Sequence, residues 1–198
     1  MDSVGGYDVN FNLPKNVDWE KIGKRITEPL TDADLERYFG SGVHSEVIKY
    51  SELAKYNTID ELLPKPFDFR ILLMEQETNS GHWVLIMKYG NTIENFNSYG
   101  IDIDKQKGML NRAMNKVLGQ EKNYLSKLVA RSPYKYVVNK HPFQKSGNDY
   151  NTCGRWVALR IITAKDMNMS LKDFTSMIEQ ATRQMRINGD ALVSLWIS

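Results

Sequence analysis

The stretch FQKSGNDYNTCGRWVALRIITA, residues 143–164, contains the only cysteine of the chain, Cys153. Asn151 or Thr152 can cap a helix that starts here, which puts Cys153 in the first turn of CGRWVALRIITA. Unpaired N–H groups and the helix dipole at this end favour negative charge, so we expect a lowered thiol pKa. Gly154 leaves room for a carbonyl group to approach the sulfur. The alternative is a small buried hydrophobic residue that happens to begin a helix.

A nucleophilic cysteine needs a base that accepts its proton, and the chain offers three histidines. His44 lies in a polar stretch with a helical pattern, where we expect a surface residue. His141 precedes a proline in a loop, and nothing around it in sequence would orient its ring. His82 opens an apolar strand pattern and is followed at once by Trp83, so we take His82 as the base.

A partner for His82 follows from the geometry of a hairpin. Residues 81–100 read as a β-hairpin with a two-residue turn at 90–91, so that paired residue numbers sum to 89 + 92 = 181. This register puts Asn97 one pleat away from His82 on the same face of the sheet. The Asn97 amide oxygen can then accept the Nδ1–H bond of His82, the third role of a Cys-His-Asn triad. A bulge would put Ser98 on that face instead.

Attack on a carbonyl group builds negative charge on its oxygen, and donors aimed at that oxygen contribute a few kcal/mol. The backbone N–H of Cys153 is one expected donor. The side-chain amide of Gln144, in the loop ahead of the helix, is the second candidate, and Asn148 is an alternative that is closer in sequence.

The patterns along the chain predict an α+β protein in which helices flank a small central mixed sheet. We expect one domain, 1–198, with a mainly helical N-terminal region, 1–66, and a catalytic core, 67–198. Residues 1–17 read as irregular, and the tail 190–198 as a final strand or a docking segment. The predicted strands are 67–76, the two arms of the hairpin and 134–139. The predicted helices are 31–57, 104–129, 152–164 and 170–187. Thr31 and Asp34 form a capping box at the start of the first helix, Met109, Met114 and Val117 lie on the apolar side of the second, and Ser170 opens the last.

Composition narrows the class of protein. A content of 41% hydrophobic residues in a chain of 198 is enough for a core, which argues against disorder. A single cysteine cannot form an intramolecular disulfide, so a reducing compartment is expected. No apolar run reaches the roughly 18 residues of a membrane span, and the start of the chain lacks the plan of a signal peptide, so we expect a non-exported protein without membrane contact. No metal-ligand spacing and no cofactor motif stands out, and we expect neither.

The net charge of +2 says little about partners. Basic residues of 105–135 form a loose cluster, which reads first as solvated helix faces and second as a nucleic-acid-binding surface.

In chain order, His82-Trp83, Asn97-Ser98-Tyr99-Gly100, Gln144 and Cys153-Gly154 resemble the pattern of the adenain and SUMO-protease group of cysteine peptidases. The resemblance covers roughly residues 70–165. Within the group, the compact size and the asparagine are similar to capsid-maturation proteases of large DNA viruses and virophages. The group usually holds its glutamine closer to the cysteine than the nine positions that separate Gln144 from Cys153.

The resemblance implies the fold of that group and an endopeptidase that cuts viral precursor or capsid proteins at Gly-Gly-X junctions, as a monomer inside the virion or the infected cell. Trp83 would line the narrow substrate tunnel, and Gly154 would adjoin it. The alternatives are an isopeptidase acting on ubiquitin or SUMO-like proteins and an acetyltransferase of the same fold group. DNA or a non-covalently bound peptide are the activators that the group suggests. The Gly6–Tyr7 bond in SVGGYDV is a candidate self-processing site, or part of a flexible tail.

Overall fold

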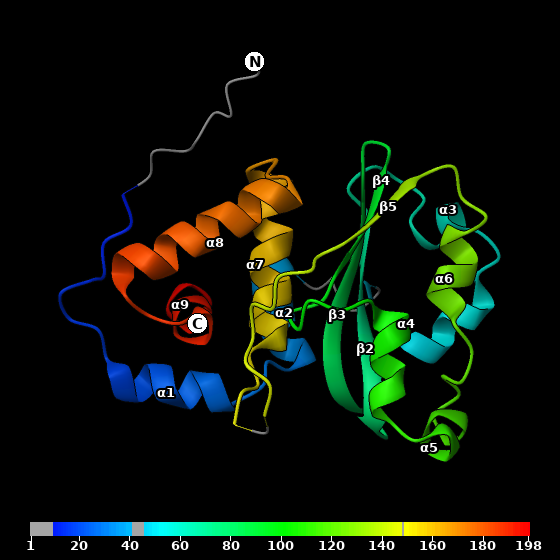
Figure 1. The fold of residues 1–198 in the computed structure, drawn as a ribbon, viewed down its shortest axis with the longest axis horizontal. Helices are drawn as coiled ribbons and strands as arrows, with labels where there is room; N and C mark the ends of the chain where they lie inside the picture. Colours follow the sequence, from blue (N-terminus) through cyan, green and yellow to red (C-terminus); the bar gives the residue numbers. More distant parts are fainter. Residues whose placement is uncertain (1–9, 41–45, 148) are drawn as a thin grey trace.

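A five-stranded mixed sheet runs through the middle of the molecule (Figure 1). The computed structural model describes residues 10–40, 46–147 and 149–198. The strands lie in the order of the chain, and β1 and β5 run parallel to their neighbours, whereas β2, β3 and β4 are antiparallel. Their bounds are β1 (Val47–Lys49), β2 (Phe69–Glu77), β3 (Ser80–Tyr89), β4 (Thr92–Phe96) and β5 (Lys135–Val138).

Helices cover both faces of this sheet, which confirms the predicted α+β class (Figure 1). One face carries α1 (Trp19–Thr27), α2 (Asp32–Phe39), α7 (Cys153–Asp166), α8 (Leu171–Met185) and α9 (Gly189–Trp196), and the other carries the 3₁₀ helix η2 (Tyr50–Lys55), α3 (Ile59–Leu62), α4 (Ile103–Gln106), the 3₁₀ helix η3 (Lys107–Met109), α5 (Arg112–Val117) and α6 (Tyr124–Val129). Among the described residues, no helix is both long and apolar enough to cross a membrane.

Alternation along the central strands divides the apolar residues into two cores. Leu73 and Leu85 point to the face covered by α7, where they join the buried Trp156. Their neighbours Leu72 and Val84 point to the opposite face, under η2 and α6. Because both faces are buried, a shift of one residue in strand pairing would exchange the two sets, so the register is strongly determined.

The hairpin forms in the predicted register. Tyr89 pairs with Thr92, and every pair up to Leu85 with Phe96 keeps the same sum, without a bulge. The predicted helix starts are also confirmed: Thr31 and Asp34 form a capping box, and Ser170 caps α8.

The predicted helix 31–57 is wrong beyond residue 39. Helix α2 ends at Phe39 because Gly40 adopts a positive φ of 81°. After the undescribed residues 41–45, the chain forms β1, which pairs with β2, and then the 3₁₀ helix η2. Pairing along the edge of the sheet here outweighs the local helical pattern.

The predicted helix 104–129 is divided into short pieces, α4, η3, α5 and α6. Asn111 caps α5 through its side chain, and Gly119 has a positive φ between α5 and α6. Met109 is 68% exposed and Val117 80% exposed, so the predicted apolar side of this segment does not form.

Both ends of the chain contain helices that the sequence patterns did not predict as such. The tail 190–198 is neither a strand nor an extended segment, because most of it belongs to α9, capped by the side chain of Asn188. Helix α1 was not predicted, and it starts at an Asp18 cap.

A buried ion pair joins α7 to β4. The Arg160 guanidinium donates two hydrogen bonds to the Glu94 carboxylate, with Nε–Oε1 2.7 Å and Nη2–Oε2 2.8 Å, and both side chains are fully buried. Arg160 Nη1 also donates to the Met169 carbonyl at 2.9 Å, and the Tyr89 hydroxyl donates to Glu94 at 2.8 Å. The two charges are therefore bidentate and surrounded by further polar partners, the arrangement that burial of an ion pair requires.

Glu94→Ala should lower the free energy of unfolding by about 3–5 kcal/mol, because it leaves the Arg160 charge buried without a counter-ion. Urea unfolding followed by circular dichroism measures the change. The matched control is Glu28→Ala, which breaks the exposed pair with Lys24 and should cost less than about 1 kcal/mol. Equal losses in the two variants would contradict the role of the buried pair.

Candidate active site

His82 and Asn97 meet where β3 and β4 separate. Their paired residues end at Leu85 and Phe96, and beyond that point His82 lies near the start of β3 and Asn97 just after β4. The imidazole Nε2 of His82 is 3.0 Å from Asn97 Oδ1, and both residues are buried. The contact predicted from the hairpin register is therefore present.

The hydrogen bonds of Asn97 determine the tautomer of His82. The backbone N–H of Tyr99 donates to Asn97 Oδ1 at 3.0 Å, and Asn97 Nδ2 donates to Gln106 Oε1 at 2.7 Å. These two bonds orient the amide oxygen toward the imidazole, so His82 Nε2 must carry the proton. The bond was predicted at Nδ1 but forms at Nε2, which leaves Nδ1 as the basic nitrogen.

Asn139 holds the backbone of Asn97 in place. Its Oδ1 accepts the Asn97 N–H at 2.7 Å, and its Nδ2 donates to the Asn97 carbonyl, also at 2.7 Å. Asn139 directly follows β5, so its side-chain amide continues the pairing of β4 with β5 after the strands end. Neither Asn139, which follows β5, nor Gln106, at the end of α4, was found from the sequence, because isolated polar residues carry no periodic signal.

Cys153 is the first residue of α7, as predicted, and the backbone N–H groups of Trp83 and Gly154 lie near enough to its sulfur to favour the thiolate. Trp83 is the next residue after His82, so the sulfur lies beside the same stretch of β3 that carries the imidazole. Trp83 lies beyond the last β3–β4 pair, so β4 does not occupy the space beside it and the Cys153 sulfur can approach its backbone N–H.

The thiol is not activated in the way that its position in the helix predicted. Burial raises the pKa of Cys153, and the hydrogen bonds from the Trp83, Gly154 and Cys153 amides oppose this only in part. Burial likewise lowers the pKa of His82 to about 4, against the bond to Asn97, which raises it. At neutral pH the site therefore holds a neutral thiol and a neutral imidazole.

Tyr99 lies against both groups. Its ring stacks on the imidazole of His82 with a centroid distance of 4.2 Å and an angle of 12° between the planes. Burial raises the pKa of the Tyr99 hydroxyl, and a negative charge on Cys153 or Asp190 raises it further. Tyr99 thus restrains the imidazole ring and lies near enough to Cys153 for a thiolate there to act on its hydroxyl.

Gln144 is buried in the loop before α7. Its Oε1 accepts a hydrogen bond from the Ser98 hydroxyl at 2.8 Å, and its Nε2 donates to the Tyr150 carbonyl at 2.7 Å. An amide nitrogen has two hydrogens, so a second donor direction exists at Nε2. The backbone N–H of Gln144 also donates to the Ser98 carbonyl at 3.0 Å, which connects this loop to the residue after Asn97.

Asp190 joins the two ends of that loop. Its Oδ1 accepts the Thr152 hydroxyl at 2.6 Å, and its Oδ2 accepts the backbone N–H of Lys145 at 3.1 Å. Lys145 follows Gln144, and Thr152 precedes Cys153. The buried Asp190 carboxylate, at the start of α9, therefore helps to determine the positions of Gln144 and Cys153. The sequence offers no signal for it, because Asp190 is distant along the chain and lies in a segment read as a tail.

The remaining predicted residues lie as follows. Trp83 lines a cavity of about 330 Å³ between the start of α2 and β1. A Cβ on Gly154 would lie 3.0 Å from Leu30 Cβ and 3.4 Å from the Trp83 ring, which gives this glycine a packing reason as well. His141 Nδ1 lies 3.5 Å from the Glu179 carboxylate on α8.

Other predicted features fall outside the described residues, namely His44, Asn148 and the Gly6–Tyr7 bond. Within the described ranges, no three His, Cys, Asp or Glu side chains gather as a metal site.

The depressed pKa of His82 makes stability depend on pH. Between the ordinary pKa of about 6.5 and the folded value of about 4, the unfolded chain binds a proton that the folded protein does not. The contribution of His82 is complete above pH 6.5 and should fall by about 3 kcal/mol as the pH drops to about 4. Urea unfolding at a series of pH values measures this loss.

The comparison that isolates this effect is His82→Gln, whose stability should fall less over the same range because the buried imidazole is then absent. His141→Gln should keep the dependence of the unchanged protein. Parallel curves for the unchanged protein and His82→Gln would show that the imidazole is not buried in its neutral form.

Among solved structures, the chain is similar to the ASFV pS273R protease, at 18% identity, with a TM-score of 0.43 over 83% of this chain and 70% of that one. It is also similar to the SUMO protease Ulp1, with its catalytic cysteine oxidized to a sulfenic acid, at 16% identity and a TM-score of 0.39 over 91% and 81% of the two chains. Scores this low carry no argument about function.

No family model matches the chain. In sequence it is 34% identical to the uncharacterized protein V9 of Sputnik virophage. The 152 aligned residues cover 76% of this chain and 85% of V9. Identity at this level over most of both chains shows common descent. The chain therefore belongs to the same protein family as V9 of Sputnik virophage.

Proposed function

We propose that this protein is a cysteine peptidase in which Cys153, His82 and Asn97 act together. The observation that carries the proposal is the bond between His82 Nε2 and Asn97 Oδ1, beside a sulfur held by the Trp83 amide. It orients the imidazole and leaves Nδ1 as the proton acceptor. A structural cysteine has no need of a buried histidine whose tautomer is set by an amide network.

The reaction follows from these positions. Cys153 attacks the carbonyl carbon of the scissile bond while its proton passes to His82 Nδ1, because the resting thiol and imidazole are both neutral. The imidazolium then gives its proton to the amine leaving group, and a thioester remains on Cys153. Water, deprotonated by His82, hydrolyses the thioester and releases the carboxylic acid and the free thiol.

The oxyanion of each tetrahedral intermediate would be held by Gln144 Nε2 and the backbone N–H of Cys153. Two contacts support Gln144 in this role. Its Oε1 is held by Ser98, so the amide cannot turn over without losing a buried hydrogen bond. Its loop is joined to the start of α7 through Asp190.

The substrates in this proposal are precursor or capsid proteins cut after Gly-Gly. Trp83, next to the base, lines a cavity bounded by edge strand β1, where a peptide can lie against the protein. A bulky indole beside the nucleophile favours small residues at the cleaved end. The relative from a virophage supports a viral setting, inside the virion or the infected cell.

Peptides with a Gly-Gly-X junction should be cut by the unchanged protein, and mass spectrometry should place the cut after the second glycine. Cys153→Ala and His82→Ala should each lower kcat/KM by at least about 10³-fold. Asn97→Asp should retain much more activity than Asn97→Ala, because an aspartate also accepts the Nε2–H bond. Cleavage that survives Cys153→Ala would refute the proposal.

Three further substrates distinguish the alternative functions. Amide substrates of ubiquitin and of SUMO test the isopeptidase alternative, and labelled acetyl-CoA tests the acetyltransferase alternative. Cleavage of ubiquitin or SUMO amides but not of Gly-Gly-X peptides would replace the precursor substrate and keep the chemistry. Added DNA or peptide at low salt shows whether either one is an activator.

Gln144→Ala should lower kcat by about 10²-fold or more with little change in KM, because the oxyanion forms only during the reaction. Ser98→Ala is the matched control: it removes the bond to Gln144 Oε1 but leaves the donor nitrogen, so its loss should be smaller. Equal losses would mean that Gln144 only supports the loop. A large loss in Asn148→Ala, with Gln144→Ala nearly unchanged, would transfer the role to Asn148.

A further inference from the structure

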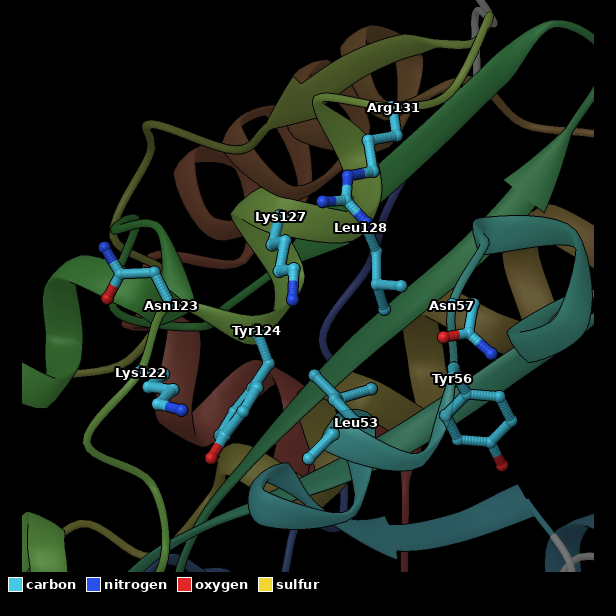
Figure 2. A pocket seen from close by; sticks show the side chains of 10 residues that line it. Leu53, Tyr56, Asn57, Lys122, Asn123, Tyr124, Lys127, Leu128 and Arg131 are labelled. Atoms are coloured by element: carbon cyan, nitrogen blue, oxygen red, sulfur yellow. The ribbon is translucent and has the colours of Figure 1, made fainter.

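A second cavity lies on the face of the sheet opposite α7, between η2 and α6, with a volume of about 240 Å³ (Figure 2). Its walls come from two segments that are far apart in the chain. Tyr56 and Asn57 follow η2 on one side, and Lys127 and Arg131 lie on the α6 side, across from them in Figure 2. The cavity is thus separated from Cys153 by the sheet.

The charged residues that line this cavity all carry the same sign. Lys122, Lys127 and Arg131 line it, and its lining includes no aspartate or glutamate among the described residues. The acidic side chains along η2 and α3 are bound to other partners: Glu52 pairs with Lys55, Asp60 pairs with Lys88, and Glu61 accepts the backbone N–H of Asn57 at 2.7 Å. Three cationic groups therefore surround one small space without a counter-ion in its lining.

The floor of the cavity is apolar. Leu53 and Leu128 are buried beneath it, and in Figure 2 their side chains lie between the two walls. The Tyr124 ring adds a flat surface, held in place by the bond from its hydroxyl to the Gly119 carbonyl at 3.2 Å. A ligand that satisfies both parts of the lining must combine several negative charges with an apolar ring.

We propose that this cavity binds a compact polyphosphate ligand with an apolar ring, of the nucleoside triphosphate class. Phosphate groups concentrate negative charge, as the neighbouring cations of Lys127 and Arg131 require, and the guanidinium of Arg131 matches phosphate oxygens in pairs. An acidic peptide spreads its carboxylates at about 3.3 Å per residue, which suits an extended surface rather than one small cavity. The ring would lie on Leu53, Leu128 and Tyr124, with the phosphates toward Lys127 and Arg131.

Isothermal titration calorimetry of the full chain with ATP, and with sodium triphosphate at matched ionic strength, tests this site. ATP should bind, and more tightly than triphosphate because only ATP has a ring for the apolar floor. The double variant Lys127→Gln/Arg131→Gln should weaken ATP binding at least 10-fold. Lys105→Gln/Lys116→Gln removes two exposed charges that do not line the cavity and should leave the affinity unchanged.

Three results would overturn the proposal: no heat with ATP at millimolar concentration, equal weakening in the two double variants, or triphosphate binding as tightly as ATP. Binding of duplex DNA without binding of ATP would also overturn it, and would assign the charges to an extended nucleic-acid surface. Cys153→Ala should bind ATP like the unchanged protein. This site and the peptidase proposal can therefore fail separately.

Discussion

The buried pair of Arg160 and Glu94 holds the helix that carries Cys153 against the strand that leads to Asn97. Both charges are fully buried, so any sliding of α7 along the sheet would leave a charge without its partner. Arg160 lies two turns after Cys153, and Glu94 lies three residues before Asn97. The relative position of Cys153 and Asn97 is thus set by an interaction outside the candidate site.

Within the candidate site, the Asn97 amide makes the bond to the imidazole that a carboxylate makes in many catalytic triads. Asn97 orients His82 without adding negative charge, so burial controls the imidazole and lowers its pKa. Asn97 is itself held by Gln106, by Asn139 and by the Tyr99 amide. In the proposed reaction, a neutral resting pair means that the proton moves as the sulfur attacks, which makes stabilisation of the developing oxyanion more important.

The loop before α7 depends on a carboxylate that belongs to the last helix. Asp190 receives hydrogen bonds from both ends of that loop, and a Cβ on the preceding Gly189 would lie 2.6 Å from the Phe143 carbonyl oxygen. Helix α9 therefore packs directly against the segment that presents Gln144 and Cys153. Helix α9, which lies far from Cys153 in the sequence, thus stabilises the loop that leads to Cys153.

The parts of the fold that rest on local geometry could be predicted from the order of the residues. The two-residue turn and the period of two in strands set the hairpin register, and that register brought Asn97 to His82. Local capping chemistry likewise placed the starts of α2 and α8. Cys153 lies in the first turn of α7, as expected from a cap at Thr152, but the Thr152 hydroxyl makes no capping bond and donates to Asp190 instead.

Properties that depend on burial or on contacts distant in sequence could be known only from the folded chain. A helix dipole acts on a thiol over one turn, but the surrounding core determines how much water reaches the thiol. Here burial raises the pKa of Cys153, which the helix position was expected to lower. Edge pairing with β2 turned residues 47–49 from a predicted helix into β1. Only the folded structure shows that Gln106 and Asn139 bind Asn97 and that Asp190 binds Thr152. A single polar residue has no periodic pattern from which its hydrogen-bond partner could be predicted.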